Sequence, residues 1–474
     1  MIYRLNKGYL LRGWDKSDWV LIRRIDNKAR FLKAEEFQAL LLCDGETDAT
    51  DECADPKISE ALKKFSDEGI ISACESVEPI DPEQYYYKYP NRYVKSIIWS
   101  MTGKCNFRCR HCFMDAPAGQ FGELDTEQAL SLIDQMAACG IMRLHLTGGE
   151  PFIRKDFWQL VDRMLEYNMK IEQIYTNGWL INDALLDEFE KRNIYPEFCI
   201  SFDGIGHHDW MRGISGAEER TLKAIKRCAE RGFIVLVEMC VHNGNKNSIR
   251  ETVRVMSEHG VMMFKVGHVS DSELWIKNCE NNRMSPEEYY EEMLKYIPQY
   301  YEDGLPIWVT LGGVVYLSPN TTEYRITSVR KCSDPENCNG LLCGCARYTG
   351  YITPDGRLLP CMPMTSASTE LQERFPLIKD IGLQRGLRES FYMDFISRRQ
   401  RELWAVNKKC DVCQYKYQCG GGCRATAVLY GEDDLMGCDS EMCYFFENGY
   451  PDKIRAVCDA AIAKYCPDAK KDNE

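Results

Sequence analysis

Residues 104–113, KCNFRCRHCF, decide the fold of this chain because they carry three cysteines at a C-x3-C-x2-C spacing. Cys105, Cys109 and Cys112 supply three thiolates, whereas protein ligands normally occupy all four iron corners of a [4Fe–4S] cluster. Three ligands leave one iron open to a small molecule. A structural zinc site would need a fourth ligand of its own, and the next cysteine along the chain is Cys139. The spacing therefore favours a cluster with an open iron.

The sequence around this motif predicts a strand, a helix and a second strand. An apolar run at 94–103, VKSIIWSMTG, leads into the cysteines. Residues 124–140, LDTEQALSLIDQMAACG, have the apolar spacing of a helix that begins at Asp125 or Thr126. The second strand, MRLHLT, ends in the Gly-Gly-Glu-Pro turn of residues 148–151.

With these elements the chain resembles the radical S-adenosylmethionine (SAM) superfamily. The resemblance implies that the open iron binds the amino and carboxylate groups of SAM's methionine part. It also implies that the turn formed by Gly148, Gly149 and Glu150 holds the amino group. The chemistry implied is reductive cleavage of SAM to a 5′-deoxyadenosyl radical, which abstracts hydrogen from an unactivated C–H bond.

Strands and helices are predicted to alternate from residue 95 to about 310. The expected strands are VKSIIWSM, MRLHLT, KIEQIYT, EFCISF, FIVLVEMCV and MFKVGHV, and the expected helices begin near Thr126, Lys155, Asn182, Ala217 and Ser248. Repeated strand–helix units of this length indicate a parallel sheet. The expected fold is α/β, with a partial (β/α)6 TIM-barrel core at 95–310 and a bridging region at 311–329.

Polar or glycine residues follow three successive strands, where such folds place their chemistry. Each of these segments could by itself be an ordinary turn. By the resemblance, Ser201 contacts the ribose hydroxyls of SAM, and Arg212 binds its carboxylate, which suits a planar guanidinium. Asp203 is either a turn former or an active-site acid, and we assign it as catalytic. The expected cofactor-binding residues are Gly148, Gly149, Glu150, Thr176, Asn177, Ser201 and Arg212.

A cysteine-rich segment at 330–450 resembles the SPASM extension of radical SAM enzymes. It begins with CGCARYTGYITPDGRLLPC and continues with KCDVCQYKYQCGGGC, spaced C-x2-C-x5-C-x3-C. The resemblance implies two auxiliary [4Fe–4S] clusters, and therefore three clusters in all. Paired structural zinc sites are the alternative. Residues 451–474 are expected to be a C-terminal tail.

The resemblance also implies ligand sets for the two auxiliary clusters. Three cysteines of the first are Cys343, Cys361 and Cys423, and its fourth ligand comes from Cys332, Cys338 or Cys345, with Cys338 preferred. The second cluster has Cys443 as its distal ligand, with Cys438 as the alternative. The expected metal ligands of the chain are Cys105, Cys109, Cys112, Cys338, Cys343, Cys361, Cys410, Cys413, Cys419, Cys423 and Cys443.

Residues 1–80 are predicted to form a winged-helix-like α+β domain, followed by a linker at 81–94. Strands are expected at YLLRGW, WVLIRRI and ARFLK, and two helices are expected to stop at Gly45 and Gly69. The layout resembles the small peptide chaperones of pyrroloquinoline quinone synthesis, in which a leader peptide adds as a strand to a sheet edge. DNA binding is disfavoured, because acidic residues outnumber basic ones here and a DNA reader needs a basic face.

Composition excludes several classes of protein. The net charge of -13 argues against binding to a nucleic-acid backbone. A signal peptide and a membrane-spanning segment are not expected, since the chain lacks the apolar runs that they need. Its 24 cysteines are expected to bind metal clusters rather than form disulfides, so we expect a cytoplasmic protein.

The predicted function is a radical SAM oxidoreductase that modifies a ribosomally made precursor peptide, whose leader binds residues 1–80. Thioether formation is the favoured outcome, with a C–C or C–O cross-link as the alternative. A sulfatase-type maturase or a cofactor-biosynthesis enzyme also remains open. The expected partners are the precursor peptide and an electron donor such as flavodoxin or ferredoxin, with no nucleic acid and no membrane.

Overall fold

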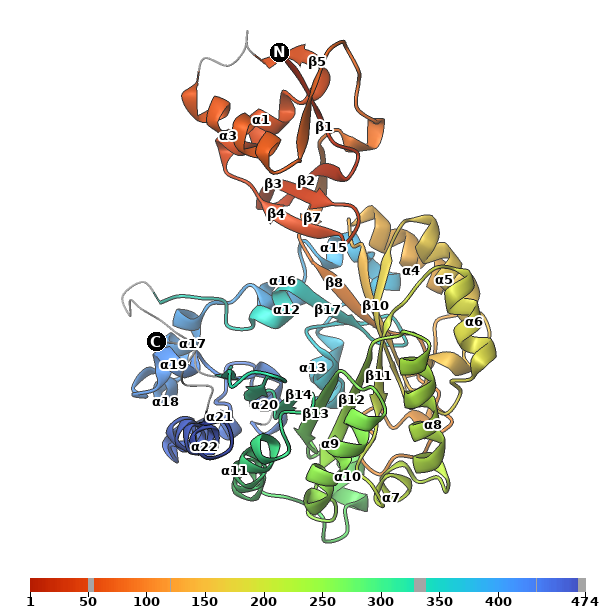
Figure 1. Ribbon diagram of the computed structural model, residues 1–474, viewed down its shortest axis with the longest axis vertical. Coiled ribbons are helices and arrows are strands. Elements are labelled where there is room, and N and C mark those ends of the chain that lie inside the picture. Colours follow the sequence, from red (N-terminus) through yellow and green to blue (C-terminus); the bar gives the residue numbers. More distant parts are fainter. Residues whose placement is uncertain (50–54, 120, 328–337, 432, 468–474) are drawn as a thin grey trace.

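A mixed sheet runs through the centre of the molecule, in the strand order β16-β15-β14-β13-β12-β11-β10-β9-β8-β17-β18 (Figure 1). The structure is a computed structural model that describes residues 1–49, 55–119, 121–327, 338–431 and 433–467. The centre of the sheet consists of consecutive parallel strands. They are β8 (Ser96–Ser100), β9 (Arg143–Thr147), β10 (Lys170–Thr176), β11 (Glu197–Ser201), β12 (Val235–Val241), β13 (Met263–His268) and β14 (Trp308–Leu311).

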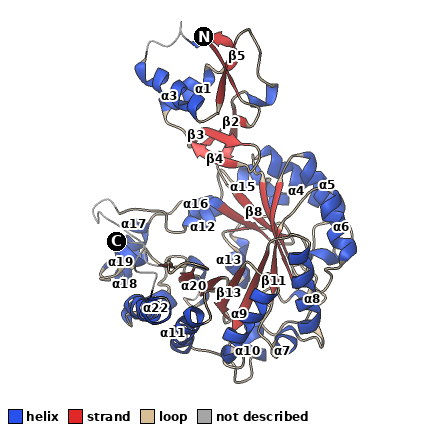
Figure 2. Cartoon of the chain, in the orientation of Figure 1, coloured by secondary structure: helices blue, strands red, loops and turns tan. Residues whose placement is uncertain are grey.

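Helices connect these strands and cover the outer face of the sheet (Figure 2). They are α4 (Thr126–Ala138), α5 (Phe157–Glu166), α6 (Asp183–Lys191), α8 (Ala217–Glu230) and α9 (Ile249–Glu258). Asp125 caps α4 by accepting a hydrogen bond from Gln128 N, and Asn182 caps α6 in the same way through Leu185 N. The predicted strands and helices are present, and the partial barrel is confirmed.

The two faces of the sheet differ in polarity. In β12, Val235, Val237 and Val241 are fully buried in the core beneath the helices, whereas Glu238 and Cys240 are partly exposed on the opposite face. Parallel strands that are covered on both faces are apolar throughout. The alternation therefore indicates that the concave face is partly open to solvent.

Strands from the C-terminal half extend this sheet on both sides. β15 (Val315–Leu317) and β16 (Tyr324–Ile326), in the expected bridging region, add antiparallel strands beyond β14. β17 (Thr349–Ile352), from the cysteine-rich segment, pairs in parallel with β8, and β18 (Leu358–Leu359) pairs with β17. The cysteine-rich segment is thus not a separate unit beginning at 330. It covers the otherwise open edge of β8, whose unpaired backbone groups would be a liability.

The expected C-terminal tail is mainly a helix. α22 (Tyr450–Tyr465) packs beside α11 (Pro286–Glu302), and the Tyr450 hydroxyl donates to Glu291 Oε1 at 3.0 Å (Figure 1). Ile454 and Cys458 of α22 are buried in the main core, which explains why the segment is ordered. Across the described residues, no helix is both long and apolar enough to cross a membrane.

Within its described residues, the N-terminal unit contains two small sheets and the helices α1 and α3, above the barrel (Figure 1). Its core includes Leu11, Leu21, Phe37, Leu62 and Phe65. One sheet is antiparallel, in the order β5-β1-β6, and the other has the order β4-β3-β2-β7. The elements are β1 (Ile2–Leu5), β2 (Tyr9–Asp15), β3 (Ser17–Arg23), β4 (Lys28–Phe31), α1 (Ala34–Leu41), β5 (Asp44–Asp48), α3 (Pro56–Asp67), β6 (Ile71–Cys74) and β7 (Tyr87–Arg92).

Two local expectations for this region were wrong. Gly45 does not end the first helix, which stops at Leu41; it lies within β5, where a Cβ would meet the Glu78 carbonyl oxygen at 1.8 Å. The segment 81–94 is not a plain linker, since β7 pairs in parallel with β2. Pairing between strands so far apart in sequence has no local signal.

The N-terminal unit is docked on the barrel through Trp14. Its indole Nε1 donates to Cys139 O at 3.0 Å, and Asn91 Nδ2 donates to the same oxygen at 3.1 Å. Gly140 follows α4 with φ of 71°, and a Cβ there would lie 2.8 Å from the Trp14 ring and 2.7 Å from the Tyr89 ring. The contact thus requires glycine at position 140.

We expect Gly140→Ala to destabilise this docking contact. Gly232 follows α8 with φ of 81°, but a Cβ there would have no atom within 4 Å, so Gly232→Ala carries the backbone strain without the clash. Urea denaturation should show Gly140→Ala losing about 1–3 kcal/mol more than Gly232→Ala, the usual cost of overpacking. Equal losses for the two variants would mean that the Trp14 contact is not tight.

Candidate functional site

The three cysteines of the C-x3-C-x2-C motif lie on the loop between β8 and α4, at the carboxyl end of the sheet. The loop folds around their sulfurs: Phe107 N donates to Cys105 Sγ at 3.3 Å, and Ala116 N donates to Cys112 Sγ at 3.5 Å. Burial raises the pKa of Cys105 to about 12. An unliganded Cys105 thiol would therefore remain protonated, whereas a metal ion would favour its thiolate.

A second segment holds the cysteine loop from the side. Arg108 N donates to Arg212 O at 3.2 Å, and Arg110 N donates to Met211 O at 2.9 Å. Arg212 ends α7 (His208–Arg212), and Gly213 follows it with φ of 67°. A Cβ on Gly213 would lie 2.4 Å from Arg108 O. The loop and α7 therefore form one rigid wall.

The Gly-Gly-Glu turn after β9 forms the opposite wall. Gly149 N donates to Thr102 O at 2.8 Å, and Glu150 N donates to Lys104 O at 2.9 Å. A Cβ on Gly149 would lie only 2.1 Å from Lys104 O, and one on Gly148 would lie 2.6 Å from Thr102 O. Both glycines are needed because the turn touches the cysteine loop backbone to backbone.

The carboxyl group of Glu150 lies in this wall. Among the described residues, no ion pair joins it to a cation. It is fully buried and accepts hydrogen bonds from Thr176 Oγ1 at 2.9 Å and from Asn177 N at 2.9 Å. Burial raises its pKa to about 7, although these hydrogen bonds act in the opposite direction. A buried carboxyl of this kind fits the ammonium group of a ligand, which would favour its ionised form.

Asn177 connects the end of β10 to the cysteine loop. Its Nδ2 donates to Asn106 Oδ1 at 2.8 Å and lies 3.9 Å from Cys105 Sγ. Its Oδ1 accepts from Trp179 N at 3.0 Å, which fixes the orientation of the amide. Thr176 and Asn177 thus orient Glu150 and the cysteine loop together. Ser201 lies half-buried at the same edge, at the end of β11.

Arg212 and Asp203 form a buried ion pair next to the cysteines. Arg212 Nε lies 2.6 Å from Asp203 Oδ2, and Arg212 Nη1 lies 3.6 Å from Cys109 Sγ. Burial opposes the charge on each group. The Arg212 guanidinium nevertheless holds the pKa of Asp203 well below its usual range, and the Asp203 carboxylate raises the pKa of Arg212. Asp203 therefore stays ionised, which suits a positioning residue for Arg212 better than a proton-donating acid.

Further residues, which the sequence analysis did not assign to the site, surround the Asp203–Arg212 ion pair. His208 Nδ1 accepts from Asp203 N at 3.0 Å, and Asn245 Nδ2 donates to Asp203 O at 2.8 Å. Ligand atoms of His111, Asp203 and Cys240 all lie within 4.8 Å of one another. Cys240 lies near the carboxyl end of its strand, as Ser201 does. The same search of strand ends could therefore have identified it from the sequence. Asn245 and His208 carry no such pattern, because only the fold brings them to Asp203.

The C-terminal cysteines form two groups. In the first, burial raises the pKa of Cys361 well above its usual value, and the neighbouring charges of Cys423, Cys343 and Cys345 raise it further. Cys345 thus lies with Cys343, Cys361 and Cys423, whereas the choice of Cys338 as the fourth ligand stays a prediction. Cys338 packs with Cys410 on the apolar cluster of Leu342, Leu403 and Trp404. Cys332 lies outside the described residues.

The second group lines one cavity. Cys410, Cys413, Cys419 and Cys443 face it together with Lys409 and Lys416. Cys438, the alternative distal ligand, has its Sγ 3.6 Å from Cys410 Sγ. Soft thiol donors gathered in this way fit an iron–sulfur cluster. The structure thus brings together Cys343, Cys361 and Cys423 in one group, and Cys410, Cys413, Cys419 and Cys443 in the other.

Comparison with known proteins agrees with this geometry. Residues 99–256 match the Radical SAM superfamily. The AdoMet-dependent heme synthase of Methanosarcina barkeri is 24% identical over 347 residues, which cover 72% of this chain and 93% of the relative. The PqqA peptide cyclase of Granulibacter bethesdensis is 25% identical over 343 residues, which cover 72% of this chain and 85% of the relative.

A solved structure matches over nearly the whole chain. Streptococcus suis SuiB, bound to its precursor peptide SuiA, superposes with a TM-score of 0.61 and 16% identity. The match covers 93% of this chain and 99% of SuiB. At this identity the likeness shows a shared fold. Because the match covers nearly the whole chain, the shared fold includes regions outside the barrel.

Glu150 should make the stability of the metal-free protein depend on pH. Its pKa is about 7 when folded, against an ordinary value of 4.5. Above pH 4.5 the unfolded chain loses this proton while the folded protein keeps it, so the free energy of unfolding should fall by about 3 kcal/mol between pH 4.5 and 7. This loss should be complete above pH 7.

Chemical denaturation at several pH values would measure the effect. Glu150→Gln should remove this fall, because the amide does not titrate. Glu251→Gln, on the exposed face of α9, should leave it in place. A pH slope that is the same for Glu150→Gln and for the unsubstituted protein would show that the buried carboxyl is not its source.

Proposed function

The chain carries a radical SAM domain at residues 99–256, and we propose that this enzyme modifies a ribosomally made precursor peptide. The observation that carries the proposal is the docked N-terminal unit above the barrel. A relative named for peptide cyclisation and a solved structure with bound precursor peptide support it. The heme synthase relative keeps cofactor biosynthesis as the second candidate.

Different residues of the site would bind the cluster and SAM. Cys105, Cys109 and Cys112 would hold the cluster, and Glu150 and Arg212 would face the amino and carboxylate groups of SAM. When bound, these cofactors supply a 5′-deoxyadenosyl radical that abstracts a hydrogen atom from the substrate. Two opposite charges on facing walls match the zwitterionic end of an amino acid.

The other residues of the site orient these groups. Asp203 holds Arg212 through the 2.6 Å ion pair, so the guanidinium is fixed before a ligand arrives. Thr176 Oγ1 donates to Glu150 Oε1 and Asn177 N donates to Glu150 Oε2, which fixes both oxygens. On the open concave face, Lys265 Nζ lies 2.9 Å from Glu238 Oε1. These polar side chains lie where a peptide substrate would pass.

We assign an auxiliary cluster to each C-terminal cysteine group. Cys343, Cys345, Cys361 and Cys423 would hold the first, and Cys410, Cys413, Cys419 and Cys443 would hold the second. An external donor such as flavodoxin or ferredoxin supplies the electron that starts each turnover. The clusters that these cysteines would hold could accept the electron released on oxidation of the substrate.

The leader peptide would bind at the free edge of the N-terminal sheet. Among the described strands, β4 pairs only with β3 in the order β4-β3-β2-β7, which leaves its outer backbone groups available. Leu32 N donates to Trp19 O, so by alternation the N–H groups of Ala29 and Phe31 point outward. An extended peptide could pair with these groups as an added strand.

The product favoured is a thioether. One C–H bond and one S–H bond break, one C–S bond forms, and two electrons leave, so the peptide loses two hydrogens. A carbon–carbon cross-link gives the same mass loss but leaves the cysteine thiol free. Alkylation with iodoacetamide separates the two outcomes, because a thioether removes one reactive thiol.

Iron content tests the cluster assignment. Anaerobically reconstituted protein should hold about 12 iron atoms, four in each of three cubic clusters. Cys345→Ser should lose up to about four, whereas the matched variant Cys338→Ser should keep its iron, since Cys338 lies outside both groups. A loss confined to Cys338→Ser, or zinc in place of iron, would overturn the assignment.

Substitutions at Phe31 test the leader site more sharply than a deletion of residues 1–80, which would strip β2 from β7. Phe31→Pro and Phe31→Ala both lose the ring, but only proline lacks the outward N–H. With a precursor peptide encoded beside this gene, mass spectrometry should show modification by Phe31→Ala and at least tenfold less by Phe31→Pro. Cleavage of SAM without peptide should be unchanged in both.

Two results would count against this proposal. Equal modification by the two Phe31 variants would show that no strand is added at β4. Failure of the unsubstituted enzyme to change the mass of the precursor would exclude peptide maturation and favour the cofactor-biosynthesis candidate.

A further inference from the structure

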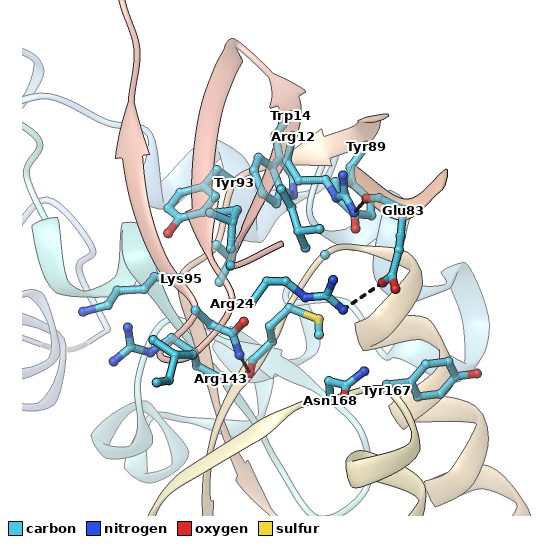
Figure 3. Close-up of a pocket in the computed structure, with 18 of the residues that line it drawn as sticks. Arg12, Trp14, Arg24, Glu83, Tyr89, Tyr93, Lys95, Arg143, Tyr167 and Asn168 are labelled. Atoms are coloured by element: carbon cyan, nitrogen blue, oxygen red, sulfur yellow. Dashed lines mark hydrogen bonds and ion pairs between the residues drawn. The ribbon is translucent and has the colours of Figure 1, made fainter. Parts of the chain in front are cut away.

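A cavity of about 480 Å³ lies between the N-terminal unit and the barrel (Figure 3). Its upper wall is one face of the four-stranded sheet. Leu10, Arg12 and Trp14 are every second residue of β2, so they share this face. Its lower wall comes from the barrel, where Lys95 precedes β8 and Arg143 begins β9. The cavity is therefore at the amino ends of the barrel strands, opposite the cysteine loop.

The walls of this cavity are held in place. Trp14 bonds the Cys139 carbonyl at 3.0 Å, and Asn27 Nδ2 donates to Met142 O at 3.2 Å on the other side. Trp14 also stacks on Tyr89, with ring centroids 5.0 Å apart. The two units are joined around the cavity, so it is a formed site rather than a gap between loosely connected domains.

The cavity is basic in a protein whose net charge is -13. Its lining contains one acidic residue, Glu83, and five cationic residues: Lys7, Arg12, Arg24, Lys95 and Arg143. Arg24 Nη2 lies 3.2 Å from Glu83 Oε2, and Figure 3 shows the Arg24 side chain extending into the space. Arg143 is paired with Glu172 outside the cavity.

Arg12 carries a positive charge, and none of the described ion pairs joins it to an acidic side chain. Its guanidinium donates instead to three main-chain oxygens: Leu11 O at 2.7 Å, Glu83 O at 2.7 Å and Tyr85 O at 3.1 Å. These bonds fix the guanidinium beneath the aromatic rings without neutralising it. A positive charge held in this way attracts an anion at little cost in side-chain entropy.

We propose that this cavity binds a carboxylate-bearing segment of the precursor peptide, an Asp or Glu next to an apolar side chain. Arg24 and Arg12 supply the attraction for the carboxylate, and Trp14, Tyr89 and Tyr93 supply the apolar surface. The inference rests on the proposed function, because it takes the occupant to be the peptide substrate. Charge complementarity identifies the occupant: Arg24 and Arg143 have acidic partners, whereas Lys7, Arg12 and Lys95 have none among the described ion pairs.

The position of the cavity also limits where the acidic residue lies in the peptide. β8 separates Lys95 from the cysteine loop by five residues, or about 17 Å at 3.3 Å per residue. An extended peptide needs at least about five residues to cover that distance. The acidic segment therefore lies outside the modified residues and acts as an anchor between leader and core.

Anisotropy of a dye-labelled peptide tests this proposal with the full-length, cluster-reconstituted protein. The probe is Glu-Glu-Leu-Glu-Glu, and the matched probe has glutamine in place of each glutamate. We expect the acidic probe to bind and Arg24→Gln to weaken it about tenfold, the scale of one charge-assisted hydrogen bond. Arg23→Gln is the control, since Arg23 lies on the opposite face of β3 and pairs with Asp26.

The cavity proposal fails if the glutamine probe binds equally well, if Arg23→Gln causes the same loss, or if the acidic probe does not bind. Processing of the precursor is followed separately by mass spectrometry. If the precursor is modified but the acidic probe does not bind, only the cavity inference fails. If the precursor is not modified, the proposed function fails, and the anisotropy result still decides whether the cavity binds carboxylates.

Discussion

The backbone contact between the Gly148-Gly149 turn and the cysteine loop is the constraint on which the rest of the site depends. Gly149 N and Glu150 N bond the carbonyl oxygens of Thr102 and Lys104, and any side chain on Gly149 would separate the two segments. Because the loops after β8 and β9 meet in this way, the carboxyl of Glu150 lies near the Cys105 thiol. The site is thus assembled from main-chain bonds, and its charges are placed on that frame.

Those charges are of two kinds. Glu150 is buried with no cation paired to it among the described residues, so its pKa is raised to about 7, whereas Arg212 is buried with its own carboxylate partner at 2.6 Å. The first group is suited to receive a ligand's positive charge, and the second is held ready for a negative one. Both are positioned by neighbours rather than by the ligand, which reduces the ordering needed on binding.

In the proposed function, the N-terminal unit links peptide recognition to this chemistry through its contact with the barrel. Trp14 serves both purposes, since its indole joins the two units and its ring lines the basic cavity. Substitutions in this contact are therefore expected to affect peptide binding as well as stability. The sheet edge at β4 and the cavity lie on the same unit, so an extended peptide could use both.

The sequence by itself determined the parallel core, because the strands and helices alternate and carry regular apolar patterns. It also determined the thiol triad from its spacing and placed Glu150, Thr176 and Asn177 at strand ends, whereas their expected roles came from the resemblance to the radical SAM superfamily. Only the tertiary structure decided that β17 covers β8 and that β7 joins the N-terminal sheet. Each of these depends on segments far apart in the chain, and such pairings are fixed by packing and unpaired backbone groups rather than by local sequence.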